Sequence, residues 1–166
     1  MDHLWLIGMM GTGKTTVGAM VAERLSLPLV DTDAAVMEQS GKTIPELFAE
    51  SESTFRRWES QAVTTIASGQ RSVVSTGGGA ILDPNNVETM RRTGTTILLT
   101  AELAELGRRL QSDTLAERPL HGGAESLERL TDDRMATYVE SADHVVDTTE
   151  RTPAEAANEV LLCVAM

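Results

Sequence analysis

The stretch "GMMGTGKTTVG", residues 8–18, directly follows the apolar run "LWLIG" at residues 4–8. It satisfies the pattern G-x-x-x-x-G-K-[ST] at Gly8, Gly13, Lys14 and Thr15. Apolar residues then recur every four positions, the spacing of one helix face, at Val17, Val21 and Leu25. The stretch is therefore predicted to lead from a strand, through a glycine-rich loop, into a helix.

A loop of this kind binds phosphate. Its glycines allow a tight turn with inward-pointing N–H groups, and the new helix directs its positive end to the same place. The lysine reaches the β and γ phosphates, and the hydroxyl after it ligates Mg²⁺. A plain glycine-rich turn is the alternative, but it would not need Lys14 and Thr15. The residues expected to contact ATP here are Gly11, Thr12, Gly13, Lys14, Thr15 and Thr16, with Thr15 also a metal ligand.

Composition narrows the possible partners. The chain of 166 residues has the size of one domain, and its 14 basic and 25 acidic residues give a net charge of -11. Such a charge opposes binding to nucleic acid or to anionic lipid, so neither is expected as a partner. With no signal-peptide pattern and no long apolar stretch, the expected location is the cytoplasm. The lone Cys163 is expected in the core rather than as a catalytic thiol.

Five short apolar runs alternate with helical patterns. The runs lie at residues 4–8, 27–31, 72–76, 95–100 and 144–148. Because they do not alternate with polar residues, both faces of each strand should be covered, as in a parallel sheet between helices. The predicted fold class is α/β. Helix starts are predicted by capping signals at Thr43 with Glu46, at Asp83 with Pro84, and at Thr152 with Pro153 and Glu155.

Two absences disfavour other proteins with the same loop. The sequence has no N-K-x-D motif for guanine recognition, and the third apolar run ends in "VVSTGGG" without an acidic residue. GTPases and motor proteins are therefore less favoured than small-molecule kinases. A kinase also needs groups that hold and orient an acceptor hydroxyl.

The second run ends in "VDTD", which places Asp31 and Asp33 at the edge of the sheet where ligands bind. One carboxylate could serve a metal and the other a hydroxyl, or one could simply cap the following helix. In "TFRRWE", Arg56 and Arg57 lie about 100° apart on a helix, so only one should face a pocket; a solvated face is the alternative. Three glycines, Gly77 to Gly79, would let the backbone approach a ligand closely.

A long segment without helical period, from Ser112 to Ala124, is predicted to be a lid that carries Arg118. A surface insertion is the alternative. An arginine brought to the phosphoryl group by closure contributes about 10³ to 10⁵ in rate. Arg134 and Tyr138, four residues apart, can share a helix face, which by itself is also typical of packing.

Taken together, "GMMGTGKTT", "VDTD", "FRRWE", "STGGGAIL", "ERPL", "DDRMATY" and "DHVVDTT" followed by "TP" resemble the shikimate kinase family, in the nucleoside monophosphate kinase-like branch of P-loop proteins. The resemblance implies a five-stranded parallel sheet of order 2-3-1-4-5. It also implies a single kinase domain over residues 1–166, with a substrate-binding helical segment at about 32–66 and a lid at about 112–124. The implied reaction is MgATP-dependent phosphorylation of the 3-hydroxyl of shikimate by a monomer.

The same resemblance implies a role for each motif residue. Lys14 and Thr15 would hold phosphate and Mg²⁺, with Asp31 near the metal through water. Asp33 would bind the acceptor hydroxyls and act as the candidate base. Arg56 and Arg134 would bind the shikimate carboxylate, and the shikimate ring would lie against Gly77, Gly78 and Gly79. Arg118 would contact the phosphates, and Arg151 and Arg109 would contact adenine. His121, where the family more often has an apolar residue, is a departure within the lid.

Two other functions stay open at this point. A kinase of a related sugar acid or cyclitol would use the same parts. A non-catalytic ATP-binding switch is less favoured, since a switch has no use for a carboxylate-binding pair of arginines.

Overall fold

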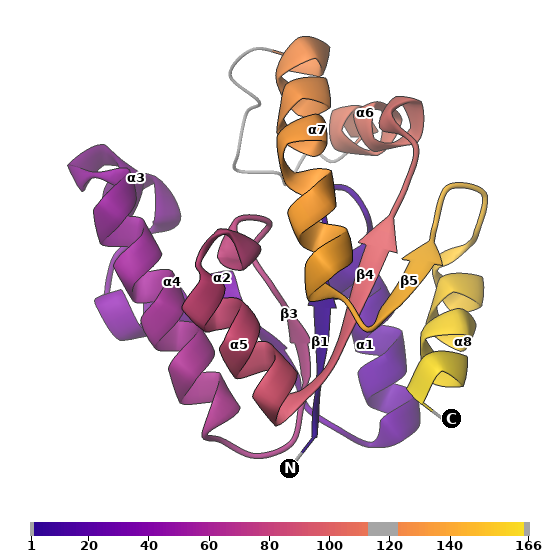
Figure 1. Cartoon of the computed structure of the whole chain (residues 1–166), viewed down its shortest axis with the longest axis horizontal. Helices are drawn as coiled ribbons and strands as arrows, with labels where there is room; N and C mark the ends of the chain where they lie inside the picture. Colours follow the sequence, from indigo (N-terminus) through magenta and orange to yellow (C-terminus); the bar gives the residue numbers. More distant parts are fainter. Residues whose placement is uncertain (1, 113–122, 165–166) are drawn as a thin grey trace.

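The predicted strands form one parallel sheet in the computed structural model, which describes residues 2–112 and 123–164 (Figure 1). The strands are β1 (His3–Ile7), β2 (Leu29–Asp31), β3 (Val73–Ser75), β4 (Gly94–Thr100) and β5 (His144–Asp147). Their order is β2-β3-β1-β4-β5, and each neighbouring pair is parallel. The predicted α/β class and the order 2-3-1-4-5 are confirmed.

Helices cover both faces of the sheet. They are α1 (Lys14–Leu25), α2 (Thr32–Ser40), α3 (Ile44–Glu50), α4 (Glu52–Ala67), the short 3₁₀ helix η1 (Ala80–Leu82), α5 (Pro84–Thr93), α6 (Leu103–Ser112), α7 (Gly123–Ser141) and α8 (Pro153–Val164). Successive side chains of β1 point to opposite faces. Leu4 and Leu6 pack with residues of α1 and α8. Trp5 and Ile7 pack with residues of α4, α5 and α7.

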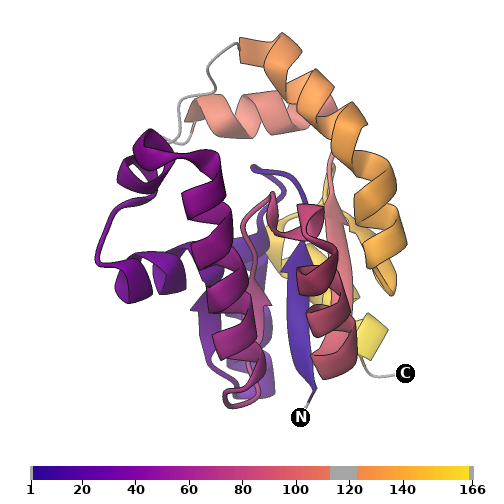
Figure 2. The same cartoon turned by 60° about the vertical axis from the view of Figure 1, so that its left-hand side comes forward.

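The helices around the strand ends form two groups. Figure 2 shows α2 to α4 (purple) on one side of the ends of the strands and α7 (orange) on the other, with α6 (salmon) lying across the top next to α7. The loop that leaves β1 lies between these groups. The fold thus presents its central loop to two separate sets of helices.

The predicted helix starts are confirmed by their hydrogen bonds. Thr43 and Glu46 form a capping box, and the Asp83 carboxylate accepts from the Asn85 N–H at 2.9 Å with Pro84 in the first turn. At the last helix, the Thr152 N–H donates to Glu155 at 2.8 Å. Each such cap contributes about 1 kcal/mol.

Cys163 is half-buried against the α1 and α8 side of the core, and burial raises the pKa of its thiol. Within residues 2–112 and 123–164, no helix is both long enough and apolar enough to span a bilayer.

His3 is a buried histidine at the start of β1. Its Nδ1 lies 3.0 Å from the Ser72 hydroxyl, and its ring centroid lies 5.5 Å from that of Trp5. Burial lowers the pKa of His3 below its ordinary value, because the charged imidazolium would lose its hydration. The histidine therefore contributes stability above its unfolded pKa of about 6.5, and this contribution falls as the pH drops below that value.

We expect the free energy of unfolding to decrease from about pH 7 to about pH 5.5, and to decrease less in His3→Asn, which keeps a polar atom near Ser72. Urea unfolding at both pH values measures the difference. Equal decreases in the two proteins would contradict the assignment to His3.

Candidate active site

The loop between β1 and α1 is shaped by glycines with left-handed or otherwise unusual backbone angles. Gly8, Gly11 and Gly13 have φ values of 142°, 81° and 89°. A Cβ on Gly8 would lie 2.3 Å from the Leu99 carbonyl oxygen, so only glycine fits there. The Lys14 ammonium donates to the carbonyls of Gly8 at 2.8 Å and Met9 at 2.9 Å. The loop carbonyls therefore hold the ammonium group inside the loop, in the place where a bound phosphate would contact it.

Three side-chain oxygens meet beside this loop. The Thr15 hydroxyl lies 3.0 Å from the Ser75 hydroxyl at the end of β3 and 3.4 Å from Asp31 Oδ2. The other oxygen of Asp31 caps α2 by accepting from the Asp33 N–H at 2.9 Å. Asp31 is thus both the helix cap and a neighbour of Thr15, so the two interpretations of this residue are compatible.

Just past the end of β3, two carboxylates lie against Gly77. A Cβ on Gly77 would lie 2.9 Å from Asp33 Oδ1 and 2.8 Å from Glu59 Oε1. Glu59 is almost completely buried and pairs with Arg56 at 2.7 Å. Arg57 is exposed, so the helix turns one of the two neighbouring arginines inward, as the 100° spacing predicts.

The triple glycine is the meeting point of α4 and α7. A Cβ on Gly79 would lie 2.2 Å from Arg56 Nη1, so the guanidinium occupies the space that a side chain would take. From α7, Arg134 Nη1 donates to the Gly78 carbonyl at 3.4 Å, and the Tyr138 hydroxyl donates to the same oxygen. The structure therefore brings Asp33, Arg56 and Arg134 together around this loop, although they come from three helices.

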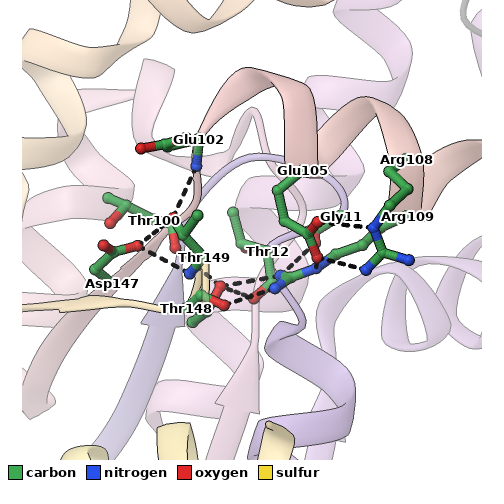
Figure 3. A network of polar contacts seen from close by, with 10 residues as sticks. All are labelled: Gly11, Thr12, Thr100, Glu102, Glu105, Arg108, Arg109, Asp147, Thr148 and Thr149. Atoms are coloured by element: carbon green, nitrogen blue, oxygen red, sulfur yellow. Dashed lines mark hydrogen bonds and ion pairs between the residues drawn. The ribbon is translucent and has the colours of Figure 1, made fainter. Parts of the chain in front are cut away.

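A pocket of about 310 Å³ opens on the α8 side of the first helix turn. Gly13, Thr16, Arg109, Thr148, Arg151 and Pro153 are among its lining residues. Figure 3 shows how Arg109 is held there: it donates to Glu105, to the Gly11 carbonyl and to Thr148. The two arginines that resemblance assigns to the nucleotide base thus line one pocket.

The predicted lid falls largely outside the described residues. Arg118 and His121 lie within residues 113–122, so their predicted positions stay predictions. The helices α6 and α7 end and begin on either side of that segment.

Two polar residues of the site were missed by the sequence analysis. Glu59 lay within the quoted motif "FRRWE", and its spacing of three residues from Arg56 is the signal that could have revealed the pair. Ser75 ends the third strand, at the position where an acidic residue is absent from the sequence. Its hydroxyl can be placed beside Thr15 only when the strand order is known.

The fold and these two sets of residues, one on each side of the glycine-rich loop, define a P-loop kinase. A sequence model of the family described as "Shikimate kinase" matches residues 10–165. The shikimate kinase of Symbiobacterium thermophilum is 46% identical over 129 residues, covering 77% of this chain and 74% of that protein. The shikimate kinase of Enterococcus faecalis is 38% identical over 164 residues, covering 97% of each. The chain belongs to the shikimate kinase family.

Solved structures agree with this assignment. The shikimate kinase from Acinetobacter baumannii in complex with shikimate superposes with a TM-score of 0.92 at 30% identity, covering 99% of this chain and 93% of that one. A gluconokinase from Sinorhizobium meliloti has a TM-score of 0.63 at 18% identity, a likeness that extends to the fold alone.

The single tyrosine of the chain reports on the side of this site formed by the triple glycine. Burial raises the pKa of Tyr138 to about 12, with the positive charge of Arg134 acting in the opposite direction. Because the native pKa is above the unfolded one, the neutral tyrosine stabilises the fold below about pH 10, and this stability is lost as the pH rises further.

We expect the native protein to show no tyrosinate absorbance at about pH 10.5, whereas the protein in denaturant titrates near pH 10. A spectrophotometric titration under both conditions measures this, with Tyr138→Phe as the blank. A native titration near pH 10 would contradict the buried, hydrogen-bonded hydroxyl.

Proposed function

We propose that this protein transfers the γ-phosphoryl group of ATP to the 3-hydroxyl of shikimate, yielding shikimate 3-phosphate and ADP for chorismate and aromatic amino acid biosynthesis. The observation that carries the proposal is the convergence of Asp33, Arg56 and Arg134 on the Gly77 to Gly79 loop. Two arginines suit a carboxylated substrate, because planar guanidinium groups offer paired donors to its oxygens. The acceptor and the nucleotide base would lie on opposite sides of the loop between β1 and α1. The base would occupy the pocket lined by Arg109 and Arg151, and Lys14 would lie between the two ligands.

The donor half of the proposed site is the loop from Gly11 to Thr16. Its N–H groups and Lys14 would bind the phosphates of ATP. The pocket lined by Arg109 and Arg151 would take the base. Arg118 would contact the phosphates from the lid, where it would stabilise the charge on the transferring group.

The donor set around Thr15 fits Mg²⁺. Ser75 Oγ and Asp31 Oδ2 lie 3.0 and 3.4 Å from Thr15 Oγ1, so the three residues offer hard oxygens, the ligand type that Mg²⁺ prefers. In the part of the chain that is described, no group of three or more His, Cys, Asp or Glu could hold a metal by itself. Thr15 would therefore ligate the ion and Asp31 would reach it through water, with nucleotide oxygens completing the shell. The ion would neutralise charge on the phosphates.

Asp33 would hold the acceptor hydroxyl and is the candidate base. It is the second residue of α2, which follows β2 directly, and its carboxylate lies against Gly77, where the ring of the acceptor would pass. Because phosphoryl transfer is largely dissociative, orientation of the hydroxyl contributes as well as removal of its proton. In catalysis, Lys14 and Arg118 would thus stabilise the negative charge on the transferring phosphoryl group, and Asp33 would orient the acceptor hydroxyl.

The other parts of the proposal follow from composition and family. The net charge of -11 opposes nucleic acid and membrane partners, so the proposed partners are small molecules only. We further propose a cytoplasmic monomer in which residues 1–166 form one kinase domain, with acceptor contacts in residues 32–66 and a lid at 112–124.

We expect purified protein with MgATP to form ADP rapidly only when shikimate is added. Asp33→Asn should lose at least about 10²-fold in kcat while its affinity for ADP stays within twofold, because Asp33 acts on the acceptor alone. A coupled ADP-release assay and calorimetric titration measure the two quantities.

Two outcomes would contradict this function. Turnover with gluconate or inositol and none with shikimate would favour a related sugar-acid or cyclitol kinase. ATP binding without turnover on any of these acceptors, unchanged in Asp33→Asn, would favour a nucleotide-dependent switch.

The neighbouring arginines of α4 provide a matched pair. Arg56→Lys keeps a positive charge beside buried Glu59 but loses the planar donors, so the KM for shikimate should rise about tenfold or more. Arg57→Lys makes the same change on an exposed residue and should leave the KM within twofold. Steady-state kinetics at saturating ATP measure both. Equal KM values in the two variants would contradict the role of Arg56.

A further inference from the structure

The network in Figure 3 joins α6 to the phosphate loop through Arg109. Arg109 Nε donates to Glu105 Oε1 at 2.7 Å, one helical turn earlier on α6. Its Nη1 donates to the Gly11 carbonyl at 3.2 Å and to the Thr148 hydroxyl at 3.0 Å, and its Nη2 donates to the Thr148 carbonyl at 2.6 Å. One guanidinium group thus connects α6, the phosphate loop and the chain after β5.

A second contact extends this hold to the next peptide of the loop. The buried Thr148 hydroxyl donates its proton between the Thr100 carbonyl at 2.9 Å and the Thr12 carbonyl at 3.3 Å. Arg109 and Thr148 therefore hold the carbonyls of Gly11 and Thr12, which belong to two consecutive peptide groups.

Holding these carbonyls also directs the N–H groups. In a trans peptide the C=O and N–H point to opposite sides, so the Thr12 N–H points away from Arg109. The Thr12 N–H donates to the Met9 carbonyl oxygen in a long hydrogen bond, with 3.4 Å between nitrogen and oxygen. The Lys14 ammonium binds the same oxygen. The network thus turns a loop N–H toward the place where Lys14 lies, and polarisation through the peptide strengthens it as a donor.

Glu105 sets the orientation of this guanidinium. Arg109 has 23% of its side chain exposed beside an open pocket, where a long side chain has other rotamers available. The Glu105 side chain is only 16% exposed, and hydrogen bonds from Arg108 and Arg109 lower the pKa of its carboxyl to about 2, so it is ionised at neutral pH. Arg108, at 69% exposure, bonds to Glu105 from the solvent side. The carboxylate therefore stays charged and bound on the helix, facing Arg109.

We propose that Glu105 is a positioning residue for nucleotide binding: it orients Arg109, and Arg109 with Thr148 fixes the phosphate-loop peptides that receive the nucleotide. This rests on the proposed function only in taking a nucleotide as the ligand of the loop. Glu105 makes its hydrogen bonds with Arg108 and Arg109 and lines the pocket proposed for the nucleotide base, so its effect should fall on the nucleotide and not on shikimate.

The test is ADP binding by calorimetry, which needs no turnover. Glu105→Gln should weaken ADP binding about tenfold, the effect of losing a charge-assisted hydrogen bond, and leave shikimate binding within twofold. Glu102→Gln is the matched control: it removes the same charge three residues earlier, where the backbone N–H of Glu102, and not its carboxylate, makes the contact in Figure 3. It should leave ADP binding within twofold.

A double-variant cycle separates positioning from a general effect of charge or folding. If Glu105 acts through Arg109, then adding Glu105→Gln to Arg109→Gln weakens ADP binding less than twofold further. A full tenfold further loss in that background would overturn the proposal, and so would a Glu105→Gln protein that binds ADP as tightly as the wild type. ADP binding by the wild type without shikimate turnover would contradict the proposed acceptor and leave the positioning role supported by the same cycle.

Discussion

The close approach of Gly8 to the Leu99 carbonyl is the constraint on which the site depends. A side chain at Gly8 would place its Cβ 2.3 Å from that oxygen, which lies near the end of β4. The chain can therefore turn from β1 into the loop this close to β4 only with glycine at this position. Because β1 is the central strand of the order β2-β3-β1-β4-β5, the loop leaves the sheet at its topological switch point, where parallel sheets bind ligands. The helices that follow β2 and β3 then lie on one side of the loop, and those that follow β4 and β5 lie on the other.

This arrangement explains how an acidic chain can bind anions. The net charge of -11 repels a triphosphate and a carboxylate at long range, but charge in a site is set by its nearest groups. Lys14 lies over the loop carbonyls, and Arg56 and Arg134 approach the triple glycine from two helices. Local cations on rigid elements therefore offset the surrounding negative charge.

Local signals in the sequence were sufficient to predict the strands and the α/β class, whereas the strand order was predicted from the family resemblance. Capping residues such as Thr43 and Asp83 act within a few positions of themselves, and the apolar runs mark the strands. The second run was predicted to begin at residue 27, whereas β2 begins at Leu29, because the Leu27 N–H still bonds to the Ala22 carbonyl in the turn after α1. Contacts between residues far apart in the sequence, by contrast, have no local pattern that predicts them. Ser75 reaches Thr15, and Thr148 reaches the phosphate loop, only through the order of the strands.

The helices on either side of residues 113–122 contact different halves of the site. Before that segment, Arg109 of α6 binds the Gly11 carbonyl of the donor loop. After it, Tyr138 and Arg134 of α7 bind the Gly78 carbonyl of the triple glycine. Each contact is a donor on a helix meeting a backbone carbonyl of a glycine loop, so a shift of either helix would move the loop that it holds. The two glycine loops therefore depend on different helices for their positions, the first on α6 and the second on α7.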